Sequence, residues 1–225
     1  EVLIEAPTYG LLLDVANYLG AQVKRIARTF ESSFDISLPE MDQAITPATR
    51  LVVLTNLPNP TRALIWWETL RAIGEMAERV GARVLVDEVY LDMLFDPAKS
   101  SAFSLGDTFV VTSSLTKAYG LSGLRCGWIL ATPKLARQIW LLNDLFAATA
   151  AHPAERMAVV AFDRLGQFRE RARALLTTNR ALVDAFLDSR PDLSSFRPPG
   201  GSVVFPRLAA GEPGAFLKLL RDKYE

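Results

Sequence analysis

The chain has 225 residues, half of them apolar, so it can bury a sizeable core in one large domain or one and a half ordinary ones. Lysine plus arginine and aspartate plus glutamate each total 25, and a net charge of zero argues against a protein that binds duplex DNA or RNA. No stretch approaches roughly 18 uncharged apolar residues and no signal peptide is recognisable, so we expect nothing in this sequence to span a membrane.

Apolar runs alternate with segments of helical spacing through the first 130 residues. We expect strands at 2–4, 21–26, 50–55, 83–86, 108–112 and 128–130, and helices at 11–19, 38–45 and 67–80. The run Arg50–Thr55 is almost continuously apolar, which is typical of a strand in the middle of a parallel sheet. Strands that alternate with helices predict a mainly parallel sheet with right-handed crossovers. The carboxyl ends of these strands then fall on one edge, where open α/β sheets bind ligands.

From Pro133 onward the pattern changes to long helical segments. We expect a helix at 135–145, a break at 147–153, an amphipathic stretch at 154–187 that is interrupted near Gly166, and a hairpin at 193–208. We therefore divide the chain into a large α/β domain at 1–155 and the start of a small α+β domain at 156–225. The chain begins inside a strand-like run and ends inside a helical one, so we expect a fragment of a longer protein.

Polar side chains follow four of the predicted strands at the shared edge. They are Tyr9, Asn59, Asp87 with Tyr90, and Ser114 with Lys117. Desolvation lowers the pKa of a lysine and frees its amine to attack a carbonyl carbon. A lysine after a strand is more often a solvated surface charge, so Lys117 gains a catalytic role only if partners lie beside it.

These segments together resemble the class I and II aminotransferases, which are fold-type-I pyridoxal-phosphate enzymes, over roughly residues 1–206. The resemblance rests on ordered motifs, with 28 residues from Asn59 to Asp87, 30 from Asp87 to Lys117 and 8 from Lys117 to Arg125. It implies an α/β fold with a mainly parallel sheet flanked by helices, followed by part of a smaller α+β domain. It also implies pyridoxal 5′-phosphate as the cofactor.

The resemblance implies a role for each residue at the edge. Lys117 would form a Schiff base with the cofactor aldehyde and later move a proton on the substrate. Asp87 would keep the pyridine nitrogen protonated, so that the ring accepts electrons; a carboxylate that merely caps a loop is the alternative. Asn59 and Tyr90 would hydrogen-bond the phenolic oxygen, although a turn residue and a core tyrosine explain them separately.

The remaining implied contacts concern the phosphate and the ring. Ser114 and Arg125 match the phosphate-binding positions, and an arginine binds phosphate through a planar fork that stays charged. Tyr9 matches the aromatic side chain that stacks on the cofactor ring, and a core tyrosine at a strand end is its alternative. Metal ligands are not expected, since one cysteine and one histidine argue against a structural zinc site.

The sequence departs from the family pattern at one position and stops short at both ends. The family usually has glycine after Asn-Pro-Thr, where this chain has Arg62, and we expect altered local geometry there rather than lost chemistry. The glycine-rich phosphate turn and the arginine that binds the substrate α-carboxylate are expected outside residues 1–225. The turn Pro199–Ser202 resembles a small-domain hairpin near the active site, and an ordinary turn explains it equally well.

Three functions fit this resemblance. The leading hypothesis is an aminotransferase that moves an amino group between an amino acid and a 2-oxo acid. A lyase of the same fold, of the carbon–sulfur type, uses the same residues, because the reaction depends on which substrate bond is held perpendicular to the ring. A third hypothesis is the aminotransferase-like sensor domain of a transcription regulator, whose DNA contacts would lie in a separate segment.

The family also implies a partner and a place in the cell. A homodimer is expected. Four aromatic residues could lie in its interface or in the core, and we expect the core for each of them: Trp66, Trp67, Trp140 and Phe146. No nucleic acid or membrane partner is expected from this segment. The single Cys126 excludes an internal disulfide and fits a reducing compartment, so we expect a cytoplasmic protein.

Overall fold

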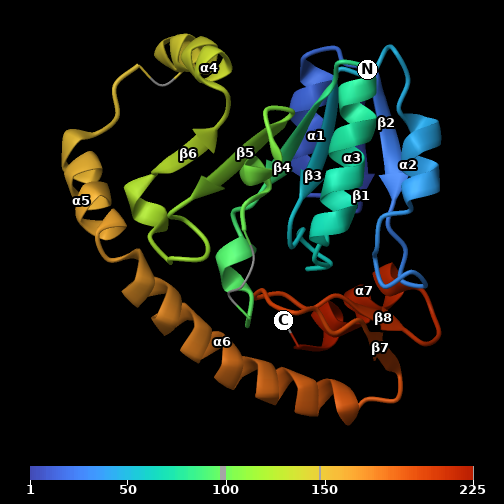
Figure 1. Ribbon diagram of the computed structural model, residues 1–225. Helices are drawn as coiled ribbons and strands as arrows, with labels where there is room; N and C mark the ends of the chain where they lie inside the picture. Colours follow the sequence, from blue (N-terminus) through green and yellow to red (C-terminus); the bar gives the residue numbers. More distant parts are fainter. Residues whose placement is uncertain (97–99, 147, 225) are drawn as a thin grey trace.

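A six-stranded sheet forms the larger part of the structure, a computed structural model that describes residues 1–96, 100–146 and 148–224 (Figure 1). The strands lie in the order β2-β1-β3-β4-β5-β6, and all neighbouring pairs are parallel except β5 with β6. Their bounds are β1 Val2–Ala6, β2 Val23–Ala27, β3 Leu51–Thr55, β4 Arg83–Asp87, β5 Phe109–Ser114 and β6 Gly127–Leu130. The predicted mainly parallel sheet is confirmed.

Three helices accompany the first four strands. They are α1 at Gly10–Tyr18, α2 at Leu38–Ala44 and α3 at Trp67–Arg79. Helix α3 buries Leu70, Ile73 and Ala77 in the main hydrophobic core, which also contains apolar residues of every parallel strand. An ideal Cβ on Gly74 would lie 2.6 Å from the ring of Phe109, so this glycine lets α3 approach β5 closely.

The second half of the chain consists mainly of helices. Helices α4 at Pro133–Phe146, α5 at His152–Phe162 and α6 at Leu165–Asp188 lead to the strands β7 at Leu193–Ser195 and β8 at Pro206–Leu208, followed by α7 at Pro213–Tyr224. Figure 1 shows α6 as one long, exposed helix between α5 and β7. The predicted interruption near Gly166 is confirmed, since the break between α5 and α6 lies at residues 163–164 and Gly166 stands in the first turn of α6. The predicted break at 147–153 begins at Ala147, outside the described residues, and α5 already starts within it.

The predicted hairpin pairs only at its two ends. Strands β7 and β8 are antiparallel, while residues 196–205 between them form no strand. The turn at Pro199–Gly201 instead contacts the segment that follows β4. Phe95 N–H donates to Pro199 O over 3.1 Å, and Gly201 N–H donates to Met93 O over 3.1 Å. Short 3₁₀ turns, which the sequence did not predict, occur at Leu91–Met93, Ala102–Leu105 and Ser122–Leu124.

The expectation that the four aromatic residues belong to the core is wrong for three of them. Trp66 is 50% exposed, Trp140 67% and Phe146 87%, because α4 buries none of its residues and Trp66 precedes α3 at the surface. Helical spacing alone does not say which apolar faces are covered. Among the described residues, no helix has both the length and the apolar character needed to cross a bilayer.

Candidate functional site

The carboxyl ends of β3, β4 and β5 meet in register and bring the predicted residues to one edge. Asp87 at the end of β4 lies between Thr55 of β3 and Thr112 of β5. Ser114 at the end of β5 pairs with Gly127, the first residue of β6. Because β6 runs antiparallel, the segment that precedes it, with Arg125, returns to the same edge. The predicted common edge is therefore confirmed.

Asp87 is partly buried and held by two donors. The Thr112 hydroxyl donates to its Oδ1 over 3.2 Å, and Val89 N–H donates to the same atom over 3.1 Å. Burial nevertheless raises the pKa of the Asp87 carboxyl above its ordinary value, because desolvation outweighs the two hydrogen bonds. No cationic side chain in the described part of the chain pairs with this carboxylate. The Asp87 carboxyl is thus held at this edge by one side-chain donor and one backbone donor.

The segment that carries Lys117 is anchored on both sides of the lysine. Leu115, Ala118 and Tyr119 are buried in a second apolar cluster, and Leu121 N–H donates to Leu115 O over 2.9 Å. The hydroxyl of Tyr119 donates to Asp92. The side chain of Lys117 is exposed between these anchors and makes no hydrogen bond or ion pair with a described residue. A fixed backbone thus presents a free amine at the edge.

Ser114 and Arg125 flank this segment. The hydroxyls of Ser114 and Thr116 lie 2.5 Å apart, and Thr116 N–H donates to Ser114 Oγ over 3.3 Å. Arg125 has a left-handed backbone, with φ of 51°, and among the described residues its exposed guanidinium donates only to Ser122 O, over 3.3 Å. Hydroxyls, a backbone N–H and an arginine fork are the donors that proteins use to bind phosphate.

The other predicted residues follow β1, β3 and β4. Tyr9 precedes helix α1 and is 50% exposed, so the core alternative for this side chain is wrong. Asn59 is partly exposed in the loop after β3, and Tyr90 follows β4. The ring of Tyr90 lies beneath the guanidinium of Arg62, with Cζ 3.6 Å from the ring centroid. In the described part of the chain, no hydrogen bond joins any of these three side chains to another predicted site residue.

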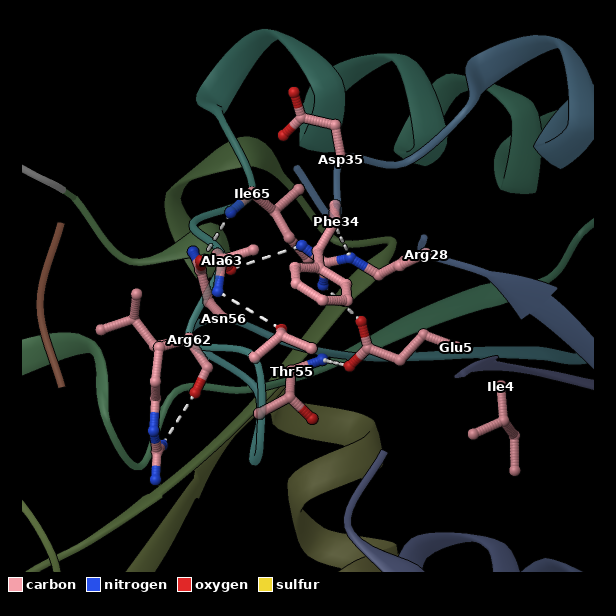
Figure 2. Close-up of polar contacts among 12 residues, drawn as sticks. Ile4, Glu5, Arg28, Phe34, Asp35, Thr55, Asn56, Arg62, Ala63 and Ile65 are labelled. Atoms are coloured by element: carbon pink, nitrogen blue, oxygen red, sulfur yellow. Dashed lines mark hydrogen bonds and ion pairs between the residues drawn. The ribbon is translucent and has the colours of Figure 1, made fainter. Parts of the chain in front are cut away.

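A buried ion pair supports the loop that carries Asn59. Arg28 Nη1 lies 2.6 Å from Glu5 Oε2, and both side chains are at most 1% exposed. Figure 2 shows how the pair connects three segments: Glu5 Oε1 accepts from Thr55 N–H over 2.5 Å, and Arg28 donates to Phe34 O over 2.5 Å and to Ala63 O over 3.3 Å. The ends of β1, β2 and β3 are thereby tied to one another and to Ala63, which follows Asn59 in the same loop.

Several residues that shape this edge were not predicted from the sequence. Thr112 and Thr116 supply hydroxyls to Asp87 and Ser114, and their positions at and just after the end of β5 were the only available signal. Glu5 and Arg28 lie 23 residues apart, and only the pairing of β1 with β2 brings them together. Arg62 was noted only as a departure from a family pattern, and its position over Tyr90 was not predicted.

Comparison with known proteins shows which family has this arrangement. The family model described as aminotransferase class I and II matches residues 1–225, the whole chain. The chain belongs to the class I and II aminotransferase family. The resemblance inferred from Asn59, Asp87, Lys117 and Arg125 is therefore confirmed at the level of the family.

The aminotransferase relatives are longer than this chain. An arginine–pyruvate transaminase of Pseudomonas aeruginosa is 28% identical over 207 residues, which cover 91% of this chain and 53% of the relative. A histidinol-phosphate aminotransferase of Pectobacterium carotovorum is 29% identical, with 97% and 59% covered. This chain thus spans about half the length of the curated relatives that it matches.

Solved aminotransferases have the same fold. A PLP-dependent aminotransferase of Streptococcus suis superposes with a TM-score of 0.90 at 30% identity, covering 98% of this chain and 59% of the other. An aspartate aminotransferase of Thermus thermophilus gives a TM-score of 0.88 at 21% identity, over 94% of this chain and 59% of the other, which supports the fold alone. The aminotransferase fold that the resemblance implied is confirmed.

Proposed function

We propose that this chain forms the pyridoxal 5′-phosphate-binding part of an aminotransferase that moves an amino group between an amino acid and a 2-oxo acid. The observation that carries the proposal is the carboxyl edge of the sheet, where the free amine of Lys117 follows β5 and the half-buried Asp87 ends the neighbouring strand β4. The donor set fits the cofactor, since Asp87 can pair with a pyridinium and Ser114, Thr116 and Arg125 can bind a phosphate. When bound, the cofactor would supply an aldehyde conjugated to an electron-accepting ring.

Each side chain then has one task. Lys117 Nζ would hold the cofactor through its aldehyde and, when free, would be the base that moves a proton from the substrate α-carbon. Asp87 would hold a proton on the pyridine nitrogen. Asn59 and Tyr90 would donate to the phenolic oxygen, and Tyr9 would cover a face of the ring. The anchored backbone on both sides of Lys117 limits the reach of its amine, which favours a defined geometry for proton transfer.

The larger assembly is inferred from the same family. We infer a cytoplasmic homodimer, and the exposed aromatic residues Trp140 and Phe146 of α4 support an interface of this kind. We also infer that residues 1–155 belong to the cofactor-binding domain and residues 156–225 to the start of the small domain. The boundary lies within α5, just before the long helix α6.

The test begins with a visible absorption spectrum of the protein at its native length after addition of pyridoxal 5′-phosphate and dialysis. Borohydride reduction and peptide mass mapping should place the cofactor on Lys117, and Lys117→Ala should retain no reduced adduct. A colourless wild-type protein, or an adduct on a different lysine, would contradict the proposal.

A second assay separates transamination from elimination. The protein is given an amino acid with each of several oxo acids, and separately a β-substituted amino acid alone. Product that depends on the oxo acid supports the aminotransferase. Pyruvate and ammonia formed without an oxo acid would mean the lyase reaction, and a bound cofactor with neither product would favour a sensor domain.

A further inference from the structure

Arg62 is a fully buried arginine with few partners. The residue is 1% exposed, its backbone is left-handed with φ of 59°, and its N–H donates to Pro58 O over 2.7 Å. Its Nη1 donates to Leu57 O over 3.0 Å, and its Nε has no hydrogen-bond partner among the described residues. No carboxylate in the described part of the chain forms an ion pair with it. A buried charge without a counter-ion is costly, so a neutral side chain would be preferred here on stability grounds alone.

The guanidinium is stacked on the side chain that we place at the cofactor. Its Cζ lies 3.6 Å from the centroid of the Tyr90 ring, which is within the range of a cation–π contact. The Arg62 side chain contacts Leu57, Tyr90 and Gly201, and the titratable groups of the segments that carry these contacts, residues 57–62, 90–95 and 199–201, are Tyr90 and Asp92 besides Arg62 itself. The Asp92 carboxylate is already engaged by Tyr119 and by Arg169, at 3.3 Å.

The turn at Pro199–Gly201 fixes Arg62 from the other side. An ideal Cβ on Gly201 would lie 2.7 Å from Arg62 Cδ, and Gly201 has φ of 95°. Because Gly201 N–H is bonded to Met93 O, the turn cannot move away without breaking that bond. The arginine side chain is therefore confined between the turn and the Tyr90 ring.

We propose that Arg62 is a positioning residue that holds the Tyr90 ring and makes the Lys117 Schiff base harder to protonate. This inference rests on the proposed function, because it assumes that Lys117 carries the cofactor and that Tyr90 faces its phenolic oxygen. A positive charge in a poorly solvated site disfavours the addition of another positive charge nearby. The same charge stabilises an anionic oxygen next to the Tyr90 hydroxyl. A Schiff base that is unprotonated in the resting protein can take up a proton after substrate binds.

The experiment is a spectrophotometric pH titration of the reconstituted protein at its native length, with no substrate present. The variants are Arg62→Met, which keeps length without charge, Arg62→Lys, which keeps charge without the planar fork, and Arg62→Gly, which restores the usual family residue. Arg207→Met is the matched control, because Arg207 also lies over a ring, with Cζ 4.0 Å from the centroid of Phe30, but at β8. Far-ultraviolet circular dichroism checks that each variant is folded.

We expect the apparent pKa of the Schiff base to rise by roughly 0.5 to 1 unit in Arg62→Met and Arg62→Gly, and to stay within roughly 0.3 unit of the wild type in Arg62→Lys and Arg207→Met. An unchanged titration in Arg62→Met, or equal shifts in the Met and Lys variants, would show that Arg62 acts only by packing. A wild-type protein that forms no adduct at Lys117 would overturn the proposed function itself and the role of Arg62 with it.

Discussion

The buried pair of Glu5 and Arg28 provides a quantitative test of how this edge is held together. Replacing Arg28 with Met removes the 2.6 Å contact and leaves the Glu5 carboxylate buried without its counter-ion. It also removes the donors to Phe34 O and Ala63 O. Breaking one side of a buried pair costs about 3 to 5 kcal/mol, and we expect a loss in that range for the free energy of unfolding.

The measurement is urea unfolding, followed by circular dichroism, of the wild type, Arg28→Met, Glu5→Gln and the double variant. The double variant has no buried charge left, so we expect it to be more stable than the sum of the two single losses predicts, by about 2 kcal/mol. Arg79→Met is the control, since Arg79 pairs with Asp42 at the surface, with side chains 61% and 55% exposed. This variant should lose less than about 1 kcal/mol. Additive single losses would refute the claim that the two charges depend on each other.

The same variants predict a pH dependence. Burial raises the pKa of Glu5, and the guanidinium of Arg28 opposes that rise. Without Arg28 the folded-state pKa of Glu5 rises further above its unfolded value, so the folded state binds a proton that the unfolded state releases. The loss in free energy of unfolding caused by Arg28→Met should therefore be smallest below the unfolded-state pKa of Glu5. It should grow as the pH rises through the folded-state pKa of Glu5. A deficit that is independent of pH between 4 and 8 would contradict this explanation.

Three further substitutions test the core and the edge. Gly74→Ala should destabilise by about 1 to 3 kcal/mol in urea unfolding despite its better helix propensity, because the new Cβ meets the Phe109 ring, whereas Gly166→Ala has no neighbour within 4 Å and should be neutral or stabilising. Asp87→Asn should raise the midpoint of thermal unfolding of the cofactor-free protein at pH 7, because burial raises the pKa of this carboxyl and the stability is lost as the pH rises through that value. The same variant should bind cofactor more weakly in a fluorescence titration. If the thermal midpoint and the cofactor affinity both rose, or both fell, the assigned role of Asp87 would be contradicted. Tyr119→Phe should lower the free energy of unfolding by about 1 to 2 kcal/mol, as its hydroxyl loses a carboxylate partner, and no change would mean that this bond adds nothing.

The sequence predicted which residues lie at the carboxyl edge of the sheet, because this depends only on the alternation of parallel strands with helices. Asn59, Asp87, Ser114 and Lys117 could be assigned to one edge because parallel strands end together and each residue follows a separate apolar run. The direction of β6 was not predicted, since a short connection permits an antiparallel return that a pattern of apolar residues does not specify.

Contacts between side chains from distant segments could not be predicted. The stacking of Arg62 on Tyr90 requires both the left-handed backbone after Thr61 and the position of the Pro199–Gly201 turn. The exposure of Trp140 depends on which neighbours cover α4, and helical spacing contains no information about neighbours. The burial of a charged pair 23 residues apart likewise follows from the register of β1 with β2.

The strand order has a consequence for how the protein is made on the ribosome. Strand β2 pairs with β1 on one side and β3 pairs with β1 on the other, and β4, β5 and β6 then each lie beside the strand that emerges just before. The sheet can therefore extend at one margin in the direction of synthesis, with each new strand docking on a margin that is already folded. Residues up to Ile65 complete the network around Glu5 and Arg28 before Asp87 and Lys117 are translated. Asp87 and Lys117 are thus synthesised after the residues of the Glu5–Arg28 network, whereas Tyr9 and Asn59 precede its completion.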